Sequence, residues 1–222
     1  MKNKHFTILC LILLPMLSYA QDDSDSKFLF EKFEKGKVIY KKGSTTTASF
    51  NYNIFTGKMV FMGDNNVIME LANPSLISFI NINDRVFEHI KNDEFYEKVK
   101  LNSETLPLYI KWYSSFISKG KTGAYGMRSV NNSSTEMKNI NQDFNGHTPD
   151  LVLGKDVVKH PKNSYFLKIK GKFQKFNSFD SLAKILKKHE LEIKEQLKES
   201  NFDFKNIEDV KKAVEYCSQF VE

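Results

Sequence analysis

The fold is decided by a segment of alternating polarity, TTTASFNYNI at residues 45–54. Its even positions, from Thr46 to Ile54, are mostly apolar, and its odd positions are polar. Successive side chains of a β-strand point to opposite faces, so this pattern predicts a strand with one buried face. The chain around it is therefore expected to build a β-sheet with one apolar side.

Turn-forming residues interrupt the chain about every 8 to 15 residues on both sides of this segment, as at Lys42-Gly43, Thr56-Gly57 and Asn73-Pro74. This rhythm is typical of an antiparallel meander. Strands are predicted at residues 37–41, 45–54, 58–62, 67–71, 77–82, 85–90, 95–101 and 106–117. No helical segment of ten residues separates them, which argues against parallel βαβ connections.

The composition changes after residue 118. Residues 119–150 are rich in Gly, Asn and Ser, and we expect them to form a flexible polar loop. Residues 151–158 and 164–176 then predict further strands, the second folded into a hairpin at Gly171-Lys172.

The C-terminal third predicts helices. Asn177 or Ser178 caps a helix that extends to Lys188, and residues 190–200 form a second helix with a favourable Glu190–Lys194 pair. Asn206 caps a third helix that ends at Phe220. The predicted fold class is α+β: an N-terminal antiparallel β meander of about eight strands, a long polar loop, a short β hairpin, and a C-terminal helical subdomain of two to three helices. The corresponding ranges are 1–20 (signal peptide), 21–118, 119–150 and 151–222.

The first 20 residues have the order of a cleavable signal peptide. A basic start with Lys2 and Lys4 precedes an apolar run at residues 6–14, and small residues at Ser18 and Ala20 suit a signal peptidase. The run is about half the roughly 20 residues that a membrane span requires. We expect cleavage after Ala20, export to the periplasm or the extracellular space, and no membrane span in the mature chain.

Charge and cysteine content restrict the partners and the chemistry. Removing Lys2 and Lys4 lowers the formal net charge from +6 to +4, which is too small and too dispersed for a nucleic-acid-binding stripe. Cys217 becomes the one remaining thiol, so no intramolecular disulfide can form. Helical spacing places Cys217 on the same face as Val210 and Val214, where we expect it to be buried.

The sequence predicts no catalytic residue, no cofactor and no metal site. The mature chain's histidines, at positions 89, 147, 160 and 189, lack metal-ligand spacing. The segment SFISKGKT at residues 115–122 ends like a phosphate-binding loop, but Ser115 stands where the first glycine is needed.

The strongest candidate contact surface combines aromatic and basic residues around the strand at 106–117. Leu106, Leu108, Ile110, Trp112 and Phe116 share one face of that strand. The surface on the other face and in the following loop comprises Tyr109, Lys111, Tyr113, Lys119, Lys121, Tyr125 and Arg128. Aromatic rings with basic neighbours bind glycans, anionic polymers or protein partners, although the same residues also cover a second packed face of a sheet.

Six short segments along the chain resemble a group of exported Bacteroidetes-type proteins of unknown function. They are KGKVIY at residues 35–40, FNYN at 50–53, ANP at 72–74, DRVF at 84–87, GKTGAYG at 120–126 and EYCS at 215–218. The resemblance implies Gram-negative export and a two-part layout, and it implies no chemistry.

These observations favour an exported soluble binding or envelope-associated module, with a protein or glycan partner and no nucleic acid. The alternatives are an unrecognised cell-envelope hydrolase and a purely structural or assembly component of the envelope. The oligomeric state stays open.

Overall fold

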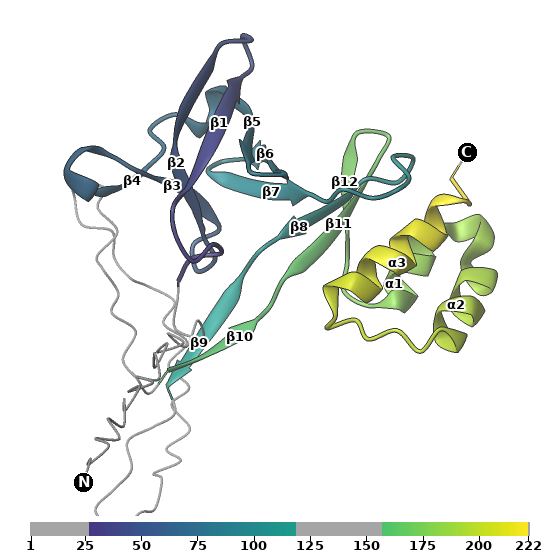
Figure 1. Cartoon of the computed structure of the whole chain (residues 1–222). Helices are drawn as coiled ribbons and strands as arrows, with labels where there is room; N and C mark the ends of the chain where they lie inside the picture. The colour runs from purple at the N-terminus through teal and green to yellow at the C-terminus, as the bar shows by residue number, and fades with distance from the viewer. Residues whose placement is uncertain (1–26, 119–156, 222) are drawn as a thin grey trace, which may run out of the picture.

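The computed structural model describes residues 27–118 and 157–221, which form antiparallel strands followed by a small helical part (Figure 1). The predicted signal peptide and the predicted loop at residues 119–150 lie outside these ranges. The strands are β1 Glu34–Tyr40, β2 Thr45–Asn53, β3 Lys58–Met62, β4 Ile68–Glu70, β5 Ile77–Ile82, β6 Arg85–Lys91, β7 Glu94–Lys98, β8 Leu108–Lys111, β9 Ser114–Ser118, β10 Val157–Pro161, β11 Ser164–Ile169 and β12 Lys172–Phe176.

The strand order differs from a simple meander. The ten-stranded sheet has the order β12-β11-β8-β7-β6-β5-β1-β2-β3-β4, so β5 returns past the first hairpins to pair with the free edge of β1. Lys58 of β3 also pairs with Glu94 of β7, which closes six of the strands into a ring. Both features depend on pairing between segments far apart in the chain, which local turn signals do not encode.

The closed part of the sheet has its own apolar core. Val38, Phe50, Ile80 and Phe87 are at most 1% exposed inside it. A Cβ atom on Gly36 would lie 2.7 Å from Cδ2 of Phe50 and 2.9 Å from the Asn81 carbonyl oxygen. Glycine at this position therefore lets β1 approach its neighbours and leaves room for the Phe50 ring.

A second core lies where β8, β11 and β12 face the helices (Figure 1). The helices are α1 Phe179–Ile185, α2 Glu190–Glu199 and α3 Ile207–Ser218. Leu108, Leu167, Leu182 and Val214 meet there with no exposed surface. None of the helices in the described part of the chain has the length and apolar character that a membrane crossing requires.

The helix predictions agree with the structure in their caps. The Ser178 hydroxyl accepts a hydrogen bond from the Ser181 amide at the start of α1, and the Asn206 side chain accepts one from the Glu208 amide at the start of α3. The Lys194 amine donates to Glu190, as the spacing predicted. The first helix ends at Ile185 and a single 3₁₀ turn follows, so its predicted end at Lys188 is wrong.

The prediction of one continuous strand at residues 106–117 is also wrong. The segment contains β8 in the large sheet and β9 in a separate sheet with β10. The backbone amide of Tyr113 donates to the Asn163 side chain, and that of Ser114 donates to the Ile54 carbonyl. These tertiary hydrogen bonds hold the chain after β8 has ended, and β9 then begins at Ser114, which pairs with Pro161 of β10.

Candidate binding surfaces

The predicted aromatic and basic surface falls partly within the described residues. Tyr109, Lys111 and Tyr113 are described, whereas Lys119, Lys121, Tyr125 and Arg128 lie outside the described ranges. As predicted, Tyr109 and Lys111 lie on the face of β8 opposite Leu108 and Ile110. The side chains of that face bond to other strands of the sheet and are not open to solvent.

Tyr109 is only 2% exposed. Its hydroxyl donates to Oε2 of Glu88 at 2.5 Å, and the Lys168 amine donates to the other oxygen of the same carboxylate at 2.9 Å. Burial, together with this hydrogen bond and the charge of Glu88, raises the pKa of Tyr109 above its ordinary value. Tyr109 therefore joins three strands and offers little surface to a partner.

Lys111 is held in a similar way. Its amine donates to Oε1 of Glu94 at 2.7 Å, and the Tyr96 hydroxyl donates to Oε2 at 3.0 Å. Burial alone would raise the pKa of Glu94, but the hydrogen bond and charge of Lys111 outweigh it, and the net pKa is lowered. Tyr113 is half-buried.

Aromatic residues of this face also come from β11 and β12, whose place in the sheet beside β8 the sequence did not predict. Phe166 on β11 lies opposite Tyr109 of β8, and its ring stacks on Tyr96 with centroids 4.8 Å apart. Phe173 on β12 meets the Tyr109 ring edge-on at 5.0 Å. The alternation in β11 is the signal that could have found Phe166, because Tyr165 and Leu167 occupy the opposite, buried face.

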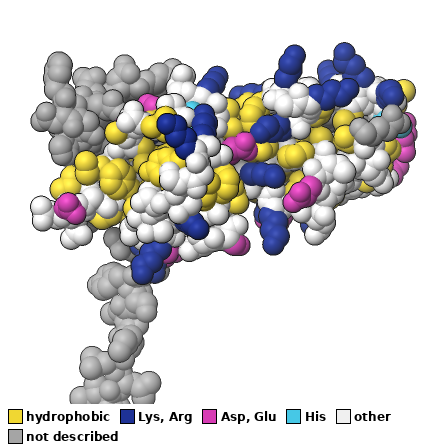
Figure 2. All heavy atoms as spheres, turned by 90° about the horizontal axis from the view of Figure 1, so that it is seen from above, with side chains coloured by type: hydrophobic (Ala, Val, Ile, Leu, Met, Phe, Trp, Pro, Cys, Tyr) yellow, Lys and Arg dark blue, Asp and Glu magenta, His cyan; other side chains and the backbone are white. Residues whose placement is uncertain are grey.

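Basic side chains nevertheless remain exposed around these rings. Lys98 lies opposite Tyr109, and Lys175 lies opposite Phe166; both are exposed. Figure 2 shows Lys and Arg side chains spread over the middle of one face, with apolar side chains visible on both sides of them. The face of β8 that carries Tyr109 is thus a packed aromatic layer with the exposed Lys98 and Lys175 beside its rings.

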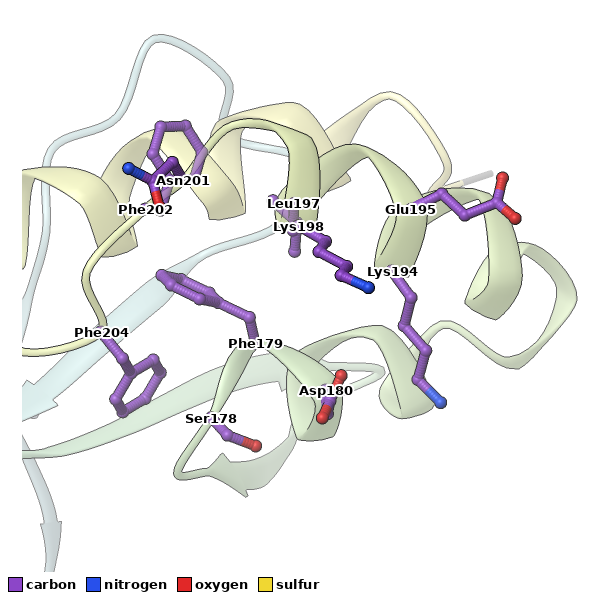
Figure 3. Close-up of a pocket in the computed structure, with 10 residues that line it drawn as sticks. All are labelled: Ser178, Phe179, Asp180, Lys194, Glu195, Leu197, Lys198, Asn201, Phe202 and Phe204. Carbon is purple, nitrogen blue, oxygen red and sulfur yellow. The ribbon is translucent and has the colours of Figure 1, made fainter.

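A groove in the helical part has a different character (Figure 3). It has a volume of about 690 Å³ and lies between α1, α2 and the connection from α2 to α3. Asn201, two residues beyond the end of α2, has a φ of 50°, the left-handed conformation that Asn tolerates better than most residues. The chain then turns back and carries Phe202 and Phe204 toward α1.

Three half-buried phenylalanines line the groove. The Phe179 ring meets Phe204 edge-on at 5.2 Å and lies 6.1 Å from Phe202. Phe204 also contacts Tyr165 and Phe176, which anchors the groove to the sheet. Leu197 of α2 is buried beside them.

Charged side chains border the groove on both sides. Figure 3 shows Lys194 and Lys198 extending from α2 toward the α1 side, where Asp180 lies. Lys194 already pairs with Glu190 at 2.5 Å. Within the described part of the chain, neither Lys198 nor Asp180 has an ion-pair partner, and both are exposed. The groove therefore presents an apolar floor between a free amine and a free carboxylate.

The described residues contain no group of three or more His, Cys, Asp or Glu placed to hold one metal ion. Comparisons with protein-family models, curated proteins and solved structures find no match.

Proposed function

We propose that this chain is an exported binding module of the cell envelope, and that it holds a segment of a partner protein in the groove between α1 and α2. Export is supported by the order of residues 1–20, and an envelope role by the resemblance of the six short segments. The observation that carries the proposal is the solvent-facing floor formed by Phe179, Phe202 and Phe204. Exposed contiguous aromatic surface marks interaction sites.

The shape of the groove favours a protein segment over a free small molecule. Small-ligand pockets enclose about 70–90% of their ligand's surface, whereas this groove is shallow and open along one side. A protein segment can place one apolar side chain on the phenylalanine floor. The rest of the segment can pack against its own protein, so the groove does not need to enclose it. Charge complementarity then assigns an acidic neighbour to Lys198 and a basic neighbour to Asp180.

Selection of displayed peptides against the mature protein tests the proposal. We expect the recovered peptides to share an apolar residue flanked by an acid, and Phe202→Ala to weaken their binding at least fivefold. Phe202 is the suitable target because Phe204 has additional contacts within the fold.

A charge reversal at the edge of the groove gives a more specific test. Lys198→Glu should change the preferred flanking residue from an acid to a base, whereas Lys205→Glu should leave it unchanged. Lys205 is exposed on the same connection but does not line the groove. If the two reversals alter peptide preference equally, or neither alters it, the groove is not the binding site.

A further inference from the structure

A second groove, of about 650 Å³, lies on the outer face of the closed sheet across β2, β1 and β5. Its polar lining comprises Lys35, Lys37, Thr47, Ser49, Asn81 and Asn83. It shares no residue with the groove between α1 and α2.

Strand register determines how these residues are arranged. Lys37 on β1 lies opposite Thr47 on β2 and opposite Asn81 on β5, and Lys35 lies opposite Ser49. Residues two apart on a strand point to the same face and are separated by about 7 Å. The two amines therefore follow one line, with hydroxyl groups on one side and amide groups on the other.

The lysines of this groove are not neutralised. Both are exposed, and neither has an ion-pair partner among residues 27–118 and 157–221. No acidic residue lines the groove, so its formal charge is +2. Lys58, Lys111 and Lys168 differ, because each of them pairs with a glutamate on another strand of the sheet.

Asn81 adds a second, independent observation. Its side-chain oxygen is covered and has no hydrogen-bond partner, while the residue as a whole is half-buried at the groove. Asn81 therefore has unused hydrogen-bonding capacity beside the two lysines. A covered carbonyl oxygen without a hydrogen-bond partner destabilises the fold, and an apolar side chain at this position would avoid that penalty.

We propose that this groove binds an acidic saccharide chain. The two amines receive carboxylate or sulfate groups, and Thr47, Ser49 and the two asparagines form hydrogen bonds with ring hydroxyls. Donors spread along both sides of the lysine line suit an extended ligand better than a single small anion. The lining contains no aromatic ring on which a nucleic-acid base could stack.

Oligogalacturonate of defined length is the test probe, and its methyl ester is the matched neutral probe. Calorimetry with the mature protein should detect binding of the acid form at least tenfold tighter than that of the ester. Lys35→Ala combined with Lys37→Ala should weaken acid-form binding at least tenfold, and Asn81→Ala at least threefold. The melting temperature of each variant reports whether the fold is retained.

Lys41→Ala combined with Lys42→Ala is the matched control, because these two lysines are exposed at the end of β1 and lie outside the groove. The control removes the same charge and should change affinity less than twofold. Equal losses from the two double variants would reduce the effect to general charge attraction and overturn the proposal. Equal binding of acid and ester, or displacement of the acid by inorganic phosphate at equal concentration, would overturn it as well.

Discussion

Glu97 stands at the junction of the two apolar cores, and its neutralisation should destabilise the protein strongly. The Glu97 carboxylate accepts hydrogen bonds from Nε of Arg85 at 2.8 Å, from Nη2 of Arg85 at 2.5 Å and from Nε1 of Trp112 at 2.5 Å. Trp112 packs against both cores, and the Arg85 guanidinium lies over the Trp112 ring. Glu97→Gln keeps the shape of the side chain but leaves the arginine without its counter-charge.

The exposure of the two paired side chains determines how large the loss of stability should be. Removing one partner of a buried ion pair costs about 3–5 kcal/mol. The side chain of Glu97 is 11% exposed but that of Arg85 is 25% exposed, so water partly compensates the remaining cation. We expect the free energy of unfolding to fall by about 3 kcal/mol, which corresponds to about 6–12 °C in melting temperature for a chain of this size.

Urea unfolding measures this change directly. Trp112 is the only tryptophan of the sequence, so its fluorescence reports on the junction while circular dichroism reports on the whole fold. Glu208→Gln is the matched control, because Glu208 pairs with Lys211 at 2.7 Å but is 67% exposed; it should cost about 0.5 kcal/mol or less. Equal costs for the two substitutions would refute the view that the junction depends on a buried charge pair.

Two further predictions concern titratable side chains. Burial raises the pKa of the Cys217 thiol to about 12, so the native protein should resist a thiol reagent at pH 8 and react after urea is added. Cys217→Ala should lower the free energy of unfolding by roughly 1 kcal/mol. Rapid labelling of the native protein would contradict the burial. The pKa of Glu94 is lowered in the folded state, so its stabilising contribution is present above its ordinary pKa and is lost as the pH falls through the folded value. Lys111→Met should therefore reduce the loss of urea stability between about pH 6 and pH 3, and an unchanged pH profile would show that the Lys111–Glu94 pair does not produce it.

Local patterns were enough to identify many elements. The segment at residues 45–54 forms β2, but the prediction that only its even positions are buried is wrong: Asn51 and Asn53 are buried, and Thr46 is exposed. Asn51 is covered because its side chain bonds the backbone of Phe30 and Lys32, a tertiary contact that alternation does not encode. The helix starts at Ser178 and Asn206 follow from capping by short polar side chains, which acts within three residues. The burial of Cys217 follows from the 3.6-residue period of α3.

Tertiary structure decided the surfaces. The pairing of Lys58 with Glu94 closes the sheet. The Glu88 carboxylate binds both Tyr109 and Lys168. The residues that the sequence predicted as an open contact surface therefore form a packed layer. The line of Lys35 and Lys37 acquires its amide neighbours only because β5 returns to pair with β1. Such contacts join residues tens of positions apart, and their free energy depends on strand order and register, which local propensity does not specify.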